Sequence, residues 1–332
     1  MDGPAFVLAD ALTKLQEDDL DIEDEVLVDA QDAQTQLAAV TRVVDAVAHS
    51  CTAVQDAATF TYAQSCIKYV GHLEPDTAHR LLDAILSGFS GLLDELADTD
   101  ATATSALAEP LERYAFLLQW LIQLLEKHRD TFARPKTSAR GARTDGAWSW
   151  AASLPTVLGV LAKALRTVSE RLWSSAAMRD TFVSRCILRP VMLLQENEAY
   201  LKVAPVKLGL FKVTCLAVKL HGQAFNVQTS IMQSLQYYEH LAEPMAELLS
   251  VLRVEFDVAR LGEDVLRELA AKSFTGLDSK SPRSYGRFLV RMAELNPHSV
   301  LKQISLLQKH QDSESYPMRN AMIEVQGPVS YT

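Results

Sequence analysis

The sequence is poor in the residues that interrupt helices. Of its 332 residues, 13 are glycine and 12 are proline, both below the usual share in a globular protein. Leucine and alanine dominate instead, and apolar residues recur at spacings of three and four positions. No segment alternates for long enough to predict a strand. We therefore expect an all-α protein built from antiparallel helical repeats, an elongated α-solenoid in which each helix pair packs on its neighbours.

Paired cysteines, long apolar runs and an export signal are also missing. The four cysteines lie far apart and form no CxxC pair, which predicts buried, reduced side chains in an intracellular protein. No run reaches the roughly 18 apolar residues of a membrane span. Asp2 and Asp10 stand where a secretory signal carries positive charge. We expect no membrane partner.

The motifs of enzymes and of metal or cofactor sites are absent from the sequence. It contains no GxGxxG, no Walker A motif and no HExxH, and its closest histidines, His72 and His79, are seven positions apart and indicate surface or capping residues. The acidic run from Asp18 to Asp24 lacks the glycine and the final glutamate of a calcium-binding loop. We therefore predict no catalytic residue, no metal, no cofactor and no small-molecule substrate, and no enzymatic activity.

Charge is distributed unevenly along the chain, although the formal total is −10. Residues 1–100 hold 20 acidic and 4 basic side chains, whereas residues 127–219 hold 16 basic and 6 acidic ones. The segment from Glu17 to Asp32 alone contains nine acids and no base. An acidic head followed by a basic middle raises the prospect of a polyanionic partner.

The helical pattern suggests four regions. We predict an acidic, largely flexible arm over 1–32 with a short helix near 5–15, and an N-terminal helical domain over 33–250. HEAT-type helix pairs follow over 251–327, and a tail over 328–332. Apolar stripes predict a helix that begins at Ala33, with a stripe from Leu37 to Val47, and another that opens at Glu74, with a stripe from Leu81 to Leu96. Further helices are predicted at about 52–70, 106–129, 148–174, 176–195, 198–220, 226–241, 244–256, 260–273, 283–294, 298–311 and 316–326.

A basic loop interrupts this pattern at 130–146, where glycine and proline occur without apolar periodicity. We expect it to contact duplex phosphates without reading sequence, together with bases on a later helix. The candidate contacts are Arg134, Lys136, Arg140, Arg143, Lys207, Lys212 and Lys219. Seven positions separate Lys212 from Lys219, and we place Lys207 near the same face. The alternative is that these bases are spread over several helices and only offset the acidic head.

Two tryptophans follow the basic loop, and aromatic rings beside basic residues can stack on nucleic-acid bases. Trp150 continues the apolar stripe of its helix, so we assign it to the core. Trp148 stays open between the two interpretations.

The clearest repeat pattern is the segment from Tyr316 to Gly327, which has the pattern of the second helix of a HEAT repeat. Pro317 suits a first helical turn, and the small Ala321 allows close helix approach. The pattern predicts a helix that ends at Gly327, a residue that permits a left-handed cap. We expect Arg319 to tie repeats together through carboxylates.

An ordered set of segments resembles one family. These are Tyr114–Leu125, Phe182–Glu196, Ala217–Gln223, Val227–Leu241, Phe288–Pro297 and Tyr316–Gly327. Together they are similar to the N-terminal region of condensin subunit 1, the non-SMC HEAT subunit of the mitotic chromosome-condensation complex. The resemblance covers roughly residues 75–327. It departs after Gly327, where the family continues its helices and this sequence stops at Thr332, which suggests a truncated product, an expression fragment or an alternative gene model.

The resemblance implies an architectural subunit that binds the kleisin, works beside the SMC ATPase subunits and helps hold DNA without hydrolysing ATP. It also implies a nuclear and chromosomal location with a cytoplasmic pool. The alternative interpretation is a helical-repeat transport or trafficking adaptor whose groove takes up peptides. A helical hydrolase or metal enzyme is disfavoured because no set of titratable residues converges.

Overall fold

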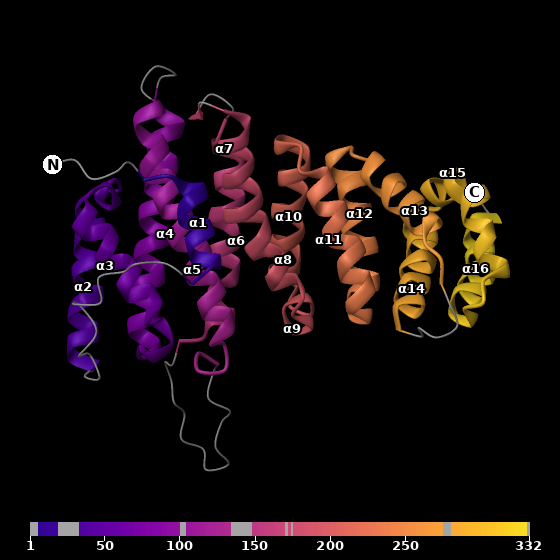
Figure 1. Cartoon of the computed structure of the whole chain (residues 1–332), viewed down its shortest axis with the longest axis horizontal. Coiled ribbons are helices and arrows are strands. Elements are labelled where there is room, and N and C mark those ends of the chain that lie inside the picture. The colour runs from indigo at the N-terminus through magenta and orange to yellow at the C-terminus, as the bar shows by residue number, and fades with distance from the viewer. Residues whose placement is uncertain are drawn as a thin grey trace, which may run out of the picture. The chain divides into compact units, whose positions relative to one another are not determined.

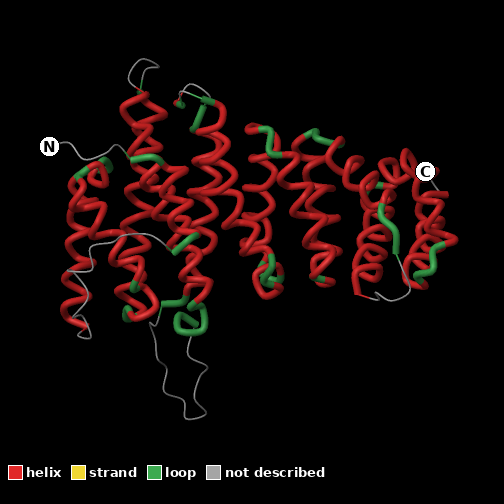
Figure 2. The backbone as a smooth tube through the Cα atoms, in the orientation of Figure 1, coloured by secondary structure: helices red, strands yellow, loops and turns green. Residues whose placement is uncertain are grey.

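The computed structural model confirms the all-α prediction. It describes residues 6–18, 33–99, 104–133, 148–169, 172–173, 175–274 and 280–330. Within this part of the chain the regular structure is helical throughout (Figure 2). The chain forms two compact units, Met1–Leu194 and Gln195–Thr332. The division falls after Leu194, whereas the sequence placed a boundary at residue 250.

The first unit consists of two helix layers. Its elements are α1 (Leu8–Gln16), α2 (Ala33–His49), α3 (Ala57–Lys68), α4 (Pro75–Asp98), α5 (Ala108–Lys127), α6 (Trp150–Thr167), α7 (Ala176–Thr181), the π-helix η6 (Phe182–Leu188) and the start of α8 (Arg189–Gln195). Helix α4 lies between α2 and α6 in one layer, and α5 packs between α3 and the π-helix in the other (Figure 1). Contacts between α4 and α5 join the layers.

Helix α5 is the centre of this unit because it is apolar almost all round, the pattern of a helix buried on every side. Tyr114, Phe116 and Leu121 have no exposed surface. The facing helix α4 places Gly88 against Tyr114, where an added Cβ would lie 2.2 Å from the hydroxyl oxygen. Glycine is required at this position for the two helices to approach so closely.

The N-terminal segment packs on the core of the first unit. Leu8 and Leu12 of α1 are buried, and the Phe6 ring lies 5.3 Å from the Phe60 ring and 6.0 Å from the Phe116 ring. The part of the predicted arm from Phe6 to the end of α1 is therefore held by apolar contacts. Residues 19–32, which carry most of its acids, lie outside the described residues.

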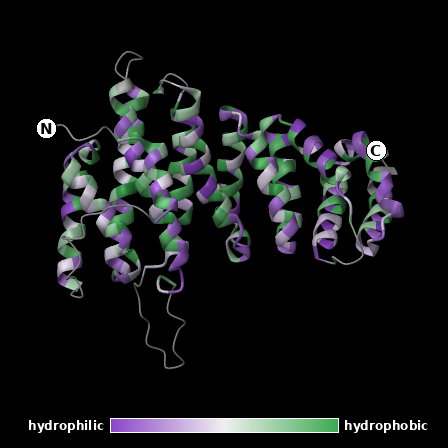
Figure 3. Cartoon of the chain, viewed as in Figure 1, coloured by the Kyte–Doolittle hydropathy of each residue, from purple (hydrophilic) through white to green (hydrophobic). Residues whose placement is uncertain are grey.

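The second unit repeats a helix-pair arrangement. Its elements are the end of α8, then α9 (Glu198–Leu201), α10 (Ala204–His221), α11 (Ala224–Tyr237), α12 (Ala242–Phe256), α13 (Arg260–Ala271), α14 (Lys280–Leu295), α15 (Pro297–Leu307) and α16 (Tyr316–Ser330). Helices α10, α12, α14 and α16 follow one another in one layer, and α11, α13 and α15 form the other (Figure 1). Apolar and polar residues alternate around the helix axes (Figure 3), as stacked amphipathic helices require. The predicted HEAT-like stacking is confirmed.

The predicted helix end at Gly327 is wrong. Helix α16 runs through this residue to Ser330. Gly327 therefore lies inside the helix and does not form the left-handed cap that a helix end there would require. The left-handed glycine among the described residues is Gly222, with φ of 66°, which ends α10. In the described part of the chain, no helix combines the length and apolar character needed to cross a membrane.

Candidate partner-binding groove

Three helices that are neighbours in one layer of the second unit, α12, α14 and α16, line a groove of about 510 Å³. Its lining residues are Glu243, Arg283, Gly286, Arg287, Val290, Arg291, Glu294, Tyr316, Pro317, Asn320, Ala321 and Glu324. Six of these twelve residues are charged and five are apolar or aromatic, so the groove offers both kinds of surface to a ligand.

The floor of the groove is a close contact between α14 and α16. A Cβ added at Gly286 would lie 3.1 Å from the Ala321 Cβ and 3.2 Å from the Pro317 carbonyl oxygen. The small residues allow this approach, as predicted for Ala321. Beside the floor, Val290 is half-buried and Tyr316 is 70% exposed. An incoming apolar side chain would find both an aliphatic and an aromatic surface here.

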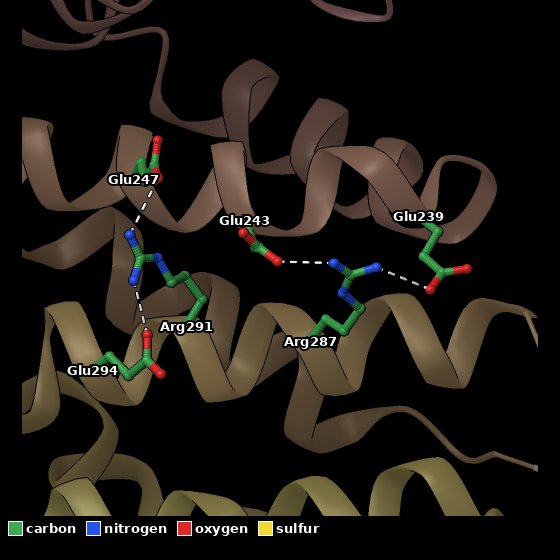
Figure 4. Close-up of polar contacts among 6 residues, drawn as sticks. All are labelled: Glu239, Glu243, Glu247, Arg287, Arg291 and Glu294. Atoms are coloured by element: carbon green, nitrogen blue, oxygen red, sulfur yellow. Dashed lines mark hydrogen bonds and ion pairs between the residues drawn. The ribbon is translucent and has the colours of Figure 1, made fainter. Parts of the chain in front are cut away.

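One wall of the groove is a charged ladder that α14 forms with α12 and with the short 3₁₀ helix η7 (Glu239–Leu241) directly before it (Figure 4). The Arg287 guanidinium donates to Glu239 at 3.2 Å and to Glu243 at 2.8 Å. The Arg291 guanidinium donates to Glu247 at 3.3 Å and to Glu294 at 2.8 Å. Arg287 and Arg291 are four residues apart and share one face of α14, and Glu243 and Glu247 likewise share one face of α12, while Glu239 precedes them in η7.

Glu247 is the most heavily engaged carboxylate of this ladder, because Lys207 from α10 also forms an ion pair with it. Burial by itself would raise the pKa of Glu247, but hydrogen bonds and charge from Lys207 and Arg291 outweigh burial and lower the pKa. Hydrogen bonds to Glu243 and Glu239 raise the pKa of Arg287 further. Both shifts favour the charged forms of Glu247 and Arg287.

Arg283 extends the arginine row by one turn toward the start of α14. Its side chain is exposed, and it forms no ion pair with another described residue. The groove thus combines an apolar floor with an arginine available at one end. This arrangement suits a segment that carries an apolar side chain and, nearby, a carboxylate.

The predicted DNA contacts are only partly placed by the structure. The four loop bases, Arg134, Lys136, Arg140 and Arg143, lie outside the described residues. Lys212 and Lys219 are exposed on α10, as predicted.

Lys207 does not extend the stripe that Lys212 and Lys219 form. It is half-buried over the Phe211 ring and pairs with Glu247. Because a helix turns by about 100° per residue, the five positions from Lys207 to Lys212 separate them by about 140° around the axis. The expectation that Lys207 lies near the face of the other two is wrong.

Both tryptophans that follow the basic loop belong to the core. Trp150 is 1% exposed and donates its indole N–H to Glu126 at 3.0 Å. Trp148 is also buried, lies stacked on the His79 ring at 5.1 Å and donates to Ser153 at 2.8 Å. The core assignment of Trp150 is confirmed. Trp148 also belongs to the core, so the interpretation in which its ring stacks on nucleic-acid bases is not supported.

Arg319 differs from its predicted role. Its guanidinium donates to the Ser313 carbonyl oxygen at 2.5 Å and lies over the Tyr316 ring at 5.9 Å. The arginine thus fixes the turn before α16 through a backbone oxygen, and the prediction that it ties repeats through carboxylates is wrong. Arg287 and Arg291, by contrast, do pair with glutamates of a neighbouring helical element. The four-residue spacing of glutamates and arginines could have revealed them, but the same spacing is common on solvated helix faces.

The comparisons with known proteins agree with the family resemblance. Residues 75–227 match the family described as non-SMC mitotic condensation complex subunit 1, N-term. Condensin complex subunit 1 of Schizosaccharomyces pombe is 31% identical over 251 residues, which are 74% of this chain and 22% of the relative. The Saccharomyces cerevisiae subunit is 26% identical over 276 residues, 78% of this chain and 23% of the relative.

A vertebrate relative gives the same result: condensin complex subunit 1 of Mus musculus is 24% identical over 270 residues, 76% of this chain and 19% of that protein. The match spans about a fifth of the length of these relatives. The resemblance predicted from the sequence is thereby confirmed, and over residues 75–227 this chain has the N-terminal region of the condensin subunit 1 family.

Proposed function

We propose that this chain acts as a scaffold within a condensin complex, as the N-terminal part of its HEAT-type subunit 1. In this role it binds the kleisin and SMC subunits and helps hold DNA on chromosomes in the nucleus, with a cytoplasmic pool, and it does not hydrolyse ATP itself. The family match and the stacked helix pairs support this function.

The observation that carries the proposal is the groove between α12, α14 and α16. Its floor at Gly286 and Ala321 is closed by small residues, while Val290 and Tyr316 offer apolar surface and Arg283 offers an available charge. An extended kleisin segment with an apolar anchor and an adjacent carboxylate fits this chemistry.

The test is a pull-down of purified kleisin with two groove variants of the chain. Arg283→Glu reverses the available charge, and Asn320→Trp fills the groove from an exposed position on α16. We expect each to weaken kleisin binding by roughly tenfold or more, the effect of losing one interface anchor. Arg260→Glu is the matched control, since Arg260 is 90% exposed on α13 outside the groove. Kleisin binding that is unchanged by both groove variants would contradict the groove as the docking site.

DNA contact is tested separately, with Lys212 and Lys219 changed to Glu in one variant and the four loop bases in another. Each lost phosphate contact should reduce the log–log salt dependence of duplex binding by roughly 0.9. Lys207→Gln serves as the control, because this lysine is engaged with Glu247. If the groove binds unrelated peptides while kleisin and DNA both fail to bind, the adaptor alternative gains support.

A further inference from the structure

A second cavity lies within the first unit, distant in sequence from the groove. It has a volume of about 310 Å³, and its walls come from α1, α5, the π-helix and α8. The residues that line it are Leu12, Leu15, Gln16, Gln119, Gln123, Arg185 and Arg189. These lining residues carry two positive charges and no negative one, so the cavity is a basic and amide-rich site.

The two arginines are supplied by an unusual stretch of backbone. Arg185 lies in the π-helix, whose other side chains Phe182, Val183 and Cys186 are buried, and Arg189 begins α8. π-Helical turns are rare and occur frequently at functional sites. Here the turn leaves Arg185 half-buried at the cavity and Arg189 exposed beside it.

The amide side chains of α5 add hydrogen-bond donors. The side-chain amide of Gln123 donates to the side-chain amide oxygen of Gln119 at 2.9 Å, which leaves the Gln119 amide nitrogen for another partner. Gln119 is 2% exposed, and its amide nitrogen has no hydrogen-bond partner among the described residues. Buried donors of this kind are nearly always paired in folded proteins, so an unpaired one beside a basic cavity indicates a missing acceptor.

Arg185 keeps donors for a ligand. One of its terminal nitrogens donates to the side-chain amide oxygen of Gln16 at 3.1 Å, and a guanidinium has five N–H donors in all. The contact with Gln16 also holds the side chain against α1. The arginine is thereby positioned before any ligand arrives, which lowers the entropic cost of binding.

We propose that this cavity binds a phosphate monoester, presented as a phosphoserine or phosphothreonine of a partner segment. A phosphomonoester carries about −1.5 to −2 charges at neutral pH, which matches the two arginines, and arginine pairs with phosphate oxygens in a bidentate fork. The Gln119 amide nitrogen is buried beside the cavity, and it supplies a third contact when its side chain turns toward the bound phosphate. A carboxylate, with one charge and two oxygens, would leave part of this donor set unused.

The test uses the whole chain and three synthetic peptides of sequence Ala-Ala-X-Ala-Ala, where X is phosphoserine, glutamate or serine. Calorimetry measures affinity, and the side-chain amide NMR signal of Gln119 reports the site directly. We expect the phosphoserine peptide to bind roughly tenfold more tightly than the glutamate peptide or better, and to shift the Gln119 signal. Arg185→Gln with Arg189→Gln should reduce its affinity at least tenfold, and Gln119→Leu by about tenfold, the effect of one hydrogen bond to a charged group.

A matched control removes the same charge elsewhere in the unit, through Arg80→Gln with Arg166→Gln, both exposed and outside the cavity. Circular dichroism melting confirms that each variant is folded. Equal loss of affinity in the control pair would overturn the proposal in favour of diffuse charge attraction. Equal affinity for the glutamate peptide, stronger binding of duplex DNA than of the phosphopeptide at this site, or an unmoved Gln119 signal would also overturn it.

Discussion

Two carboxylates of α5 are buried in the first unit, and each accepts a hydrogen bond from a tryptophan. Glu112 accepts from the Trp173 indole at 2.9 Å, and Glu126 accepts from Trp150 at 3.0 Å. Burial raises the pKa of Glu112, although the Trp173 hydrogen bond opposes this rise. A buried charge without a full counterion destabilises the fold, so this residue carries a cost at neutral pH.

We therefore expect Glu112→Gln to change how stability depends on pH. Because the folded-state pKa of Glu112 lies above its unfolded value of about 4.3, the folded state binds more protons in the interval between them. The free energy of unfolding of the wild type then falls as pH rises through this interval. The glutamine variant keeps an acceptor for Trp173 but cannot ionise, so its stability relative to wild type should increase from pH 4 to pH 7. Urea unfolding at both pH values measures the difference, and a constant difference would contradict the prediction.

A second prediction concerns Gly88 and Tyr114. An alanine methyl at residue 88 would overlap the Tyr114 ring, and we expect Gly88→Ala to destabilise the protein by about 1–3 kcal/mol. Gly159→Ala is the matched control on α6, where nothing lies within 4 Å of an added Cβ, and it should gain up to about 1 kcal/mol of helix propensity.

Rescue distinguishes a clash from a general helix effect at this position. The Tyr114 hydroxyl is buried and has no hydrogen-bond partner among the described residues, so Tyr114→Phe should cost little. Combined with Gly88→Ala, it should recover part of the lost stability, because the oxygen is the nearest atom to the new methyl. Strict additivity in thermal unfolding of the four proteins would refute the clash.

At the scale of elements, the ladder between α12 and α14 predicts unequal roles for its glutamates. Glu247 is 26% exposed and binds both Lys207 and Arg291, whereas Glu239 is 39% exposed and binds Arg287 alone. We expect Glu247→Gln to cost about 1–2 kcal/mol at neutral pH, because it weakens two charge-assisted hydrogen bonds. Glu239→Gln, the control, should cost less than about 1 kcal/mol, as exposed pairs do.

At acidic pH, the difference in lost unfolding free energy between Glu247→Gln and Glu239→Gln should disappear. The pKa of Glu247 is lowered in the folded state, so its contribution is present above the unfolded value of about 4.3 and is lost as pH falls through the folded one. Denaturant unfolding of both variants near neutral pH and at pH 3 measures the change. A Glu247→Gln penalty that persists undiminished at pH 3 would show that the side chain stabilises by packing instead.

The sequence predicted most helices because their apolar stripes are wide and regular, as in α4, where Leu81, Ile85 and Phe89 are all buried. It did not predict the π-helix, since one widened turn leaves the apolar residues at nearly the same spacing. It also placed a cap at Gly327, although glycine permits a left-handed residue without requiring one. The groove could not be predicted, because its floor depends on how closely Gly286 approaches α16, a distance set by tertiary packing.

At the scale of the whole molecule, the distribution of charge governs association with polyanions. The nine acids from Glu17 to Asp32 account for almost all of the net charge of −10. Changing these nine to the corresponding amides would bring the formal charge to −1, and we expect duplex DNA to bind more tightly at low salt. The gain should shrink at high salt, where screening acts over about 3 Å at 1 M. Filter binding across a salt series measures it, and an equal gain at every salt concentration would contradict an electrostatic origin.

The ladder between α12 and α14 has a periodicity that bears on movement. Glutamates at 239, 243 and 247 and arginines at 283, 287 and 291 repeat at the same interval, which is close to one helical turn of about 5.4 Å. If α14 slid by one turn, Arg287 would face Glu243 and Glu247, and Arg283 would take over Glu239. The ion pairs therefore hold the helices together without fixing their register. The contacts that oppose such a slide come from the other neighbours of α14: the Tyr285 hydroxyl donates to the Met232 carbonyl oxygen of α11 at 2.8 Å, and Gly286 packs against Pro317 and Ala321 of α16. Under a pulling force, this pair of helices would shear in discrete steps, exchanging partners at each one instead of separating.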